Sequence, residues 1–157
     1  MTLINTLKIL TEKIKEVYEK YPQEKVPMQI YLLLVHYHGI DWNKYVKISK
    51  TYNREVLHSC EDFDLVIITW DSKHECPIHN HPENGCQVKI LEGTITEERY
   101  DMETLEKIQT KEYMRDSIFY IDDSIAYHRM CNNKNTKCVS LHVYSPGKYK
   151  PKLFNKK

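Results

Sequence analysis

The chain has 157 residues, of which 41% are hydrophobic and 29% charged, enough apolar material for the core of one globular domain. Its 23 basic and 22 acidic residues leave a formal net charge of +1, which gives no electrostatic reason to expect a nucleic acid or a membrane as partner. The four glycines are scattered and form neither a GxGxxG motif nor a P-loop. A small molecule is therefore the expected ligand.

The first 40 residues are expected to be helical. Residues 2–21 place apolar side chains at three- or four-residue steps with charges between them, which is typical of an amphipathic helix. Pro27 can begin a second helix that carries the apolar run Ile30 to Val35 towards a stop at Gly39. This run is far shorter than the roughly 20 residues that span a bilayer. We expect residues 1–40 to cover the open flank of a sheet.

From residue 41 on, short runs rich in β-branched and aromatic residues alternate with polar stretches, which is typical of antiparallel strands. The expected strands are 51–58, 63–70, 78–81, 85–91, 94–101, 105–113, 117–120, 125–131 and 137–144. No helical pattern separates them, which favours a sandwich or a jelly roll over an α/β fold. We expect a single domain over residues 1–157, with the barrel at 41–147.

The last ten residues, 148–157, contain five lysines, at positions 148, 150, 152, 156 and 157. Chain ends rich in charge are commonly solvated, so this stretch is expected to be a basic tail. The N-terminal residues interleave charges with apolar positions and do not resemble a secretory signal. We expect a cytoplasmic protein that acts as a monomer.

The five cysteines contain no CxxC pair, and their odd number leaves one unpaired, which argues against a secreted disulfide framework. Cys60, Cys131 and Cys138 are expected to be small hydrophobic residues of strands. Most of the thiols are therefore expected to be reduced.

The segment from Cys76 to His81 contains an HxH pattern made by His79 and His81. Residues two apart on a strand share one face, so both imidazoles can reach one divalent metal ion. A third ligand is expected from another strand, and His128 is the best candidate there. Glu83 can compete as a ligand, although a loop carboxylate more often faces solvent.

A second interpretation is a compact zinc module, Cys-x2-His-x-His-x4-Cys, because zinc accepts two thiolates and two imidazoles tetrahedrally. Its four ligands would be Cys76, His79, His81 and Cys86. Such a non-catalytic zinc-binding module would leave Arg54, His128 and His142 without a role.

A longer set of motifs follows in order along the chain: Tyr52-Asn53-Arg54, Trp70, His79, His81, Cys86, Leu91-Glu92-Gly93, Asp123-Ser124, His128-Arg129 and Ser140 to Pro146. Together these motifs resemble the cysteine dioxygenases of the cupin superfamily, where a non-catalytic zinc-binding cupin remains an alternative. In many other cupins a glutamate occupies the slot of Cys86. The resemblance covers roughly residues 40–147, and it implies a mainly β fold, a cupin jelly-roll β-barrel preceded by two N-terminal helices.

The resemblance implies a ferrous ion, Fe(II), held by His79, His81 and His128, with positions left open for substrate. It implies oxidation of the thiol of L-cysteine by dioxygen to cysteine sulfinic acid. A dioxygenase for another small thiol, such as 3-mercaptopropionate, is the close alternative. Because the chain ends soon after Pro146, the resemblance also leads us to expect fewer C-terminal strands and a more open pocket wall.

The same resemblance assigns Arg54 to the substrate carboxylate, which a guanidinium can hold in a bidentate manner, with Tyr52 beside it. Trp70 would form a wall of the pocket.

On the strand 137–144 the resemblance implies that Ser140 orients His142 and that His142 holds the Tyr144 hydroxyl near the substrate. Cys86 and Tyr144 correspond to the pair that is joined by a thioether in animal cysteine dioxygenases. We treat the formation of this crosslink as a hypothesis.

Overall fold

The computed structural model describes residues 2–155, and the chain divides into two units, residues 1–46 and residues 47–157. The first unit contains two α-helices, α1 (Leu7–Lys20) and α2 (Val26–His36), and two short 3-10 helices, Gln23–Lys25 and Asp41–Tyr45. No helix within the described range is long and apolar enough to cross a membrane. Whether this unit covers a sheet stays a prediction.

Helix α1 begins later than its hydrophobic pattern suggested because Thr6 caps it. The Thr6 side chain accepts a hydrogen bond from the Ile9 amide at 3.1 Å, which satisfies one of the free amides of the first turn. Before the cap, Ile4 pairs with Tyr37 in an isolated bridge. The N-terminal residues are therefore extended up to the cap.

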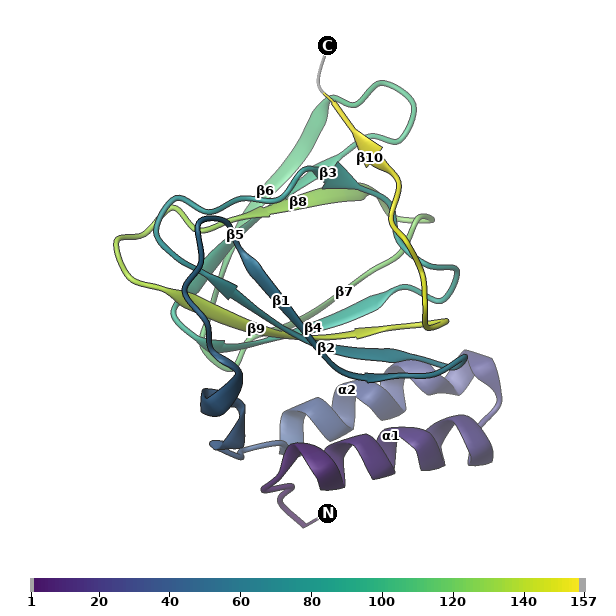
Figure 1. The fold of residues 1–157 in the computed structure, drawn as a ribbon. Coiled ribbons are helices and arrows are strands. Elements are labelled where there is room, and N and C mark those ends of the chain that lie inside the picture. Colours follow the sequence, from purple (N-terminus) through teal and green to yellow (C-terminus); the bar gives the residue numbers. More distant parts are fainter. Residues whose placement is uncertain (1, 156–157) are drawn as a thin grey trace. The chain divides into compact units, whose positions relative to one another are not determined.

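The second unit consists of ten strands in two antiparallel sheets (Figure 1). Their bounds are β1 (Asn53–Ser59), β2 (Asp64–Trp70), β3 (Ile78–His79), β4 (Cys86–Glu92), β5 (Thr94–Tyr100), β6 (Lys107–Met114), β7 (Ile118–Ile121), β8 (Tyr127–Cys131), β9 (Cys138–Tyr144) and β10 (Leu153–Phe154). One sheet has the order β1-β2-β9-β4-β7 and the other β10-β3-β8-β5-β6. From β2 onwards the chain crosses repeatedly between the sheets, as in a jelly roll.

The core of this unit comes from apolar side chains of both sheets. Its buried members include Val66, Ile68, Val88, Ile95 and Met130. Burial of such side chains is the main favourable contribution to folding. The fold is thus the predicted cupin jelly-roll barrel with helices N-terminal to it, and the expected strands are confirmed with shifts at their ends.

The stretch expected to be a solvated basic tail includes the short strand β10. It pairs with β3, so an additional strand completes the second sheet. The side chains of Lys148, Lys150 and Lys152 are exposed, as the tail prediction required, but their backbone belongs to an ordered segment. Lys156 and Lys157 lie outside the described residues.

Candidate metal centre and active site

Three histidines converge between the two sheets of the barrel. His79 ends the two-residue strand β3, His81 follows it, and His128 lies on β8 directly opposite His79. One ligand nitrogen from each histidine lies within 4.8 Å of the other two. The Nε2 atoms of His79 and His128 are 3.1 Å apart. The structure thus brings together the three residues that the sequence predicted as metal ligands.

Each of the three rings is fixed through its other nitrogen, Nδ1. The contacts are His79 with the Pro77 carbonyl at 2.8 Å, His81 with the Asp123 carboxylate at 3.1 Å, and His128 with the Glu97 carboxylate at 2.7 Å. Carbonyl and ionised carboxylate oxygens only accept hydrogen bonds, so Nδ1 carries the proton in each ring. Burial lowers the pKa of all three histidines, which keeps the rings neutral. Each Nε2 therefore presents a lone pair to the centre.

The donor set fits a divalent transition metal. The Nε2 atom of His81 is buried and has no hydrogen-bond partner within residues 2–155. A buried polar atom without a partner costs free energy, and a cation beside it removes that cost. Neutral imidazoles suit iron, zinc and copper, and three ligands on one side leave further positions open, as in ferrous oxygenases. Glu83 is exposed and does not belong to the converging group.

The compact zinc module of the second interpretation is not formed. In the described part of the chain, neither Cys76 nor Cys86 belongs to the group whose donor atoms converge. Cys76 lies 3.9 Å from Nδ1 of His79, the nitrogen that already contacts the Pro77 carbonyl. Burial raises the pKa of the Cys76 thiol to about 11, which disfavours the thiolate in the metal-free protein. That interpretation is therefore set aside.

The histidines open into a cavity of about 260 Å³. Its walls come from both sheets and from residues that follow β9, among them Tyr149 and Pro151. The polar and aromatic lining residues include Tyr52, Arg54, Trp70, Cys86, His142, Tyr144 and Tyr149. A cavity of this size lies below the roughly 300 Å³ at which drug-sized ligand sites begin, so it suits a small metabolite.

Strand β9 contributes a hydrogen-bonded row of side chains to this cavity. Ser140 Oγ lies 2.7 Å from His142 Nε2, and His142 Nδ1 lies 3.2 Å from the Tyr144 hydroxyl. Trp70 donates from Nε1 to Ser140 Oγ at 2.9 Å. Trp70 therefore does more than wall the pocket, because it fixes the end of the row.

Cys86 and Tyr144 stand directly opposite each other on β4 and β9. Residues in such a register have Cβ atoms about 5 Å apart on the same face of the sheet. All five cysteines are free, and Cys86 is buried with 2% of its surface exposed. Burial raises the pKa values of both the Cys86 thiol and the Tyr144 hydroxyl. Cys86 and Tyr144 are therefore neighbours across two adjacent strands.

Arg54 on β1 reaches the cavity near Tyr144. Its Cζ atom is 5.6 Å from the centre of the Tyr144 ring, within cation-π range. Within residues 2–155, none of the ion pairs involves Arg54. Tyr52, two residues earlier, stacks on Trp70 with ring centres 5.0 Å apart. Arg54 thus offers a cavity-lining guanidinium that no carboxylate of the described chain engages.

Several residues of the site were not assigned a role from the sequence. Glu97 and Asp123 contact two of the histidines, and Asn80 and Tyr149, which both line the cavity, contact each other. Glu97 stands in the run Glu-Glu-Arg, which reads as an exposed charged strand, yet it is 1% exposed. Only the strand register places it beside the histidine, and no local signal could have shown this.

A family model, "Cysteine dioxygenase type I", matches residues 4–157. Among curated proteins, cysteine dioxygenase type 1 of Rattus norvegicus is 33% identical over 114 residues, which cover 68% of this chain and 57% of that protein. The human protein is 32% identical over the same shares of the two chains. The chain therefore spans 57% of the length of these curated relatives.

Solved structures show the same fold. An uncharacterized protein with a double-stranded β-helix domain from Klebsiella pneumoniae aligns with a TM-score of 0.61 at 18% identity, over 73% of this chain and 94% of its own. A cupin superfamily protein from Desulfitobacterium hafniense gives a TM-score of 0.55 at 8% identity, over 69% and 90%. Taken with the family model that matches almost every residue, the barrel and its histidine centre place the chain in the cysteine dioxygenase type I family.

Proposed function

We propose that this chain is an Fe(II)-dependent dioxygenase that oxidises the thiol of L-cysteine to cysteine sulfinic acid. One observation carries the proposal: the lone pairs of three neutral histidines converge at the wall of a small cavity that Arg54 also lines. The histidines suit a metal ion with open positions, and the guanidinium suits a carboxylate. A small thiol with a carboxylate matches both requirements.

The reaction adds both atoms of dioxygen to one sulfur, so that RSH and O2 give RSO2H without a further reductant. Ferrous iron, held by His79, His81 and His128, would supply the redox chemistry that allows dioxygen to react with the thiolate. Arg54 holds the substrate carboxylate and thereby fixes the direction in which the sulfur points. Positioning of this kind favours a single oxidation product because it limits which atoms meet.

The row on β9 directs a proton into the cavity. Trp70 donates to Ser140, so the Ser140 hydroxyl hydrogen is available for His142 Nε2. His142 then carries its proton on Nδ1 and donates it to the Tyr144 oxygen. The Tyr144 hydroxyl hydrogen remains free to point at the substrate. Burial raises the pKa of Tyr144, which keeps this hydrogen in place at neutral pH.

The proposal includes the thioether between Cys86 and Tyr144. Forming this bond removes two hydrogens, and dioxygen accepts the two electrons. The opposite register of the two residues supports it. The free state of all five cysteines supports the expected cytoplasmic setting, where thiols stay reduced.

The decisive experiment measures oxygen consumption by the iron-loaded chain with L-cysteine, cysteamine and 3-mercaptopropionate, and identifies the sulfinate by mass. We expect L-cysteine to be the best substrate because it has both the carboxylate and the amine. His128→Ala should lose iron and activity together. If protein that contains one iron per chain consumes no oxygen, the proposal is refuted. If His128→Ala retains its full iron content, the ligand assignment is refuted.

A further inference from the structure

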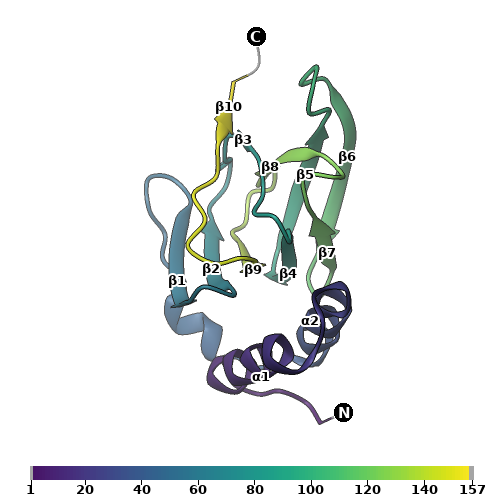
Figure 2. The ribbon, with the colours of Figure 1, turned by 90° about the vertical axis from the view of Figure 1, so that its right-hand side faces the viewer.

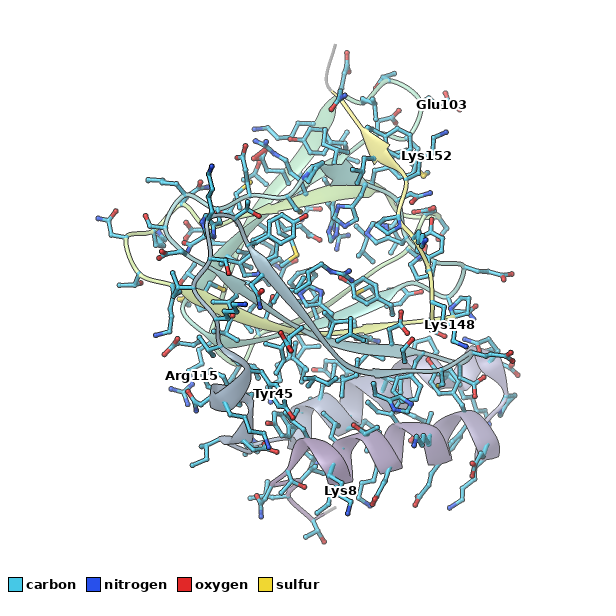
Figure 3. All side chains as sticks on the ribbon, in the orientation of Figure 1. Lys8, Tyr45, Glu103, Arg115, Lys148 and Lys152 are labelled. Carbon is cyan, nitrogen blue, oxygen red and sulfur yellow. The ribbon has the colours of Figure 1, made fainter. Side chains whose placement is uncertain are left out.

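After β9 the chain leaves one sheet and crosses to the other, where it ends in β10 (Figure 1, yellow). We call residues 147–154 the C-terminal segment. Figure 2 shows its end beside β3, the strand that carries His79. Lys148 and Lys152, labelled in Figure 3, stand near the two ends of the segment. The segment thus spans from one sheet to the other at the edge of the barrel.

Alternate residues of the C-terminal segment face the cavity. Tyr149, Pro151 and Leu153 line it, whereas the lysines between them are not among the lining residues. Tyr149 is half-buried, and Pro151 and Leu153 also expose surface to solvent. Leu153 stands directly opposite His79 in the β3–β10 register. This segment therefore contributes part of the cavity lining next to a predicted metal ligand. The more open wall expected from the sequence stays a prediction.

Asn80, between His79 and His81, holds the segment in place. Its Oδ1 accepts hydrogen bonds from the Tyr149 hydroxyl at 2.6 Å and from the Lys152 amide at 2.7 Å. The backbone N–H of Asn80 donates to the backbone carbonyl of Lys152 at 3.2 Å. We call this set of contacts the Asn80 clip.

Both ends of the segment are anchored as well. The Lys148 amide donates to Asp64 Oδ2 at 2.9 Å, which ties the start of the segment to β2. At the other end the Phe154 ring stacks on Tyr127 of β8 with centres 4.4 Å apart. With both ends fixed and the middle clipped, the wall cannot retreat without breaking several contacts at once.

We propose that the C-terminal segment, held by the Asn80 clip, limits the size of the thiol that the site accepts. The cavity of about 260 Å³ is small, and the C-terminal segment contributes Tyr149, Pro151 and Leu153 to its lining. A second residue joined to cysteine adds bulk that the Tyr149 and Leu153 side chains restrict. This inference rests on the proposed function and names residues that set its substrate range.

The test compares L-cysteine with L-cysteinylglycine for the wild-type chain, Tyr149→Phe, Tyr149→Ala and Lys150→Ala. Tyr149→Phe removes only the hydroxyl that contacts Asn80, Tyr149→Ala removes the aromatic side chain from the wall, and Lys150→Ala changes an exposed residue of the same segment. We expect Tyr149→Ala to raise the ratio of kcat/KM for the dipeptide over that for cysteine about tenfold, a size expected for relief of a steric exclusion. Tyr149→Phe should give a smaller rise, and Lys150→Ala none.

A binding measurement separates this inference from the proposed function. Anaerobic titration of each Fe(II)-loaded protein with the two thiols reports their affinities whether or not turnover occurs. If the wild-type chain binds cysteine but does not oxidise it, the proposed function is contradicted. The size limit is still supported if the wild type binds cysteine more tightly than the dipeptide and Tyr149→Ala reduces that difference. The size limit is refuted if Tyr149→Ala, at full iron content, discriminates between the thiols as the wild type does, or if Lys150→Ala relaxes discrimination equally. Leu153→Ala tests the same wall if Tyr149→Ala does not fold.

Discussion

Glu97 offers the sharpest test of how the barrel prepares its histidines. Its side chain is 1% exposed and divides its two oxygens between Nδ1 of His128 at 2.7 Å and Nε of Arg99 at 2.8 Å. Glu97→Gln keeps the shape of the side chain but replaces one acceptor oxygen by an amide that can only donate. One of the two contacts must then place two donors against each other. If that contact is with His128, the ring is driven towards the tautomer whose Nε2 carries hydrogen and cannot bind a metal.

The magnitude follows from these two contacts. Replacing the outer partner of a metal-binding histidine lowers metal affinity about 10- to 100-fold, which is about 1.4 to 2.8 kcal/mol of binding free energy. The Arg99 side chain is 14% exposed and loses its only paired carboxylate within the described residues. Leaving such a charge unpaired costs about 3 kcal/mol of folding stability. The variant should therefore be weaker in metal binding and less stable without metal.

Calorimetric titration of the metal-free protein with Fe(II) under anaerobic conditions measures the first effect, and urea unfolding in a chelator measures the second. Glu98→Gln is the matched control, because Glu98 is also a buried carboxylate of β5 but pairs with Arg129 and touches no predicted ligand. It should lose stability and keep metal affinity. Wild-type affinity in Glu97→Gln, or an equal loss in Glu98→Gln, would refute the reasoning.

Three further outcomes are expected. Arg54→Ala should raise the KM for L-cysteine at least about tenfold with unchanged iron content, since it removes a charge-assisted contact to the carboxylate; steady-state kinetics and metal analysis check this, and a matching loss of iron would contradict it. After prolonged turnover, intact-mass analysis should find a form lacking two hydrogens that is absent from Cys86→Ser; failure to find it refutes the crosslink to Tyr144. Burial opposes ionisation of Glu98, but hydrogen bonds from Arg129 and Tyr100 lower its pKa to about 2. Because this pKa lies below that of Glu98 in the unfolded chain, ionised Glu98 contributes about 3 kcal/mol to the free energy of unfolding, fully above about pH 4.5 and no longer as pH falls towards 2. Urea unfolding at several pH values should therefore show a free energy of unfolding that falls less steeply in acid for Glu98→Gln than for the wild type.

Most strands could be predicted because their residues carry the signal locally. The runs that became β2, β4 and β9 are rich in β-branched and apolar residues and end at polar turns. The HxH pair was also local, since His79 and His81 need only the geometry of one short strand. His128 required the resemblance as well as its place in a β-like run.

The remaining parts depend on register and on contacts distant in sequence. Glu97 meets His128 because β5 pairs with β8, a relation between residues 31 positions apart. The C-terminal segment was expected to be a solvated tail because its lysines dominate the composition. Its residues Tyr149, Pro151 and Leu153 line the cavity through contacts between residues distant in sequence, such as the hydrogen bond from the Tyr149 hydroxyl to Asn80, 69 positions earlier. Neither relation leaves a trace in local composition.

The facing positions of Cys86 and Tyr144 on neighbouring strands have a consequence for the lifetime of the molecule. A covalent bond there changes the native state little, because the strands are already paired. In the unfolded chain it closes a loop of roughly 60 residues, and the lost conformational entropy raises the free energy of the unfolded state by about 4 kcal/mol. Molecules that have completed more turnovers would then carry the crosslink more often. Their average resistance to unfolding would rise with catalytic use.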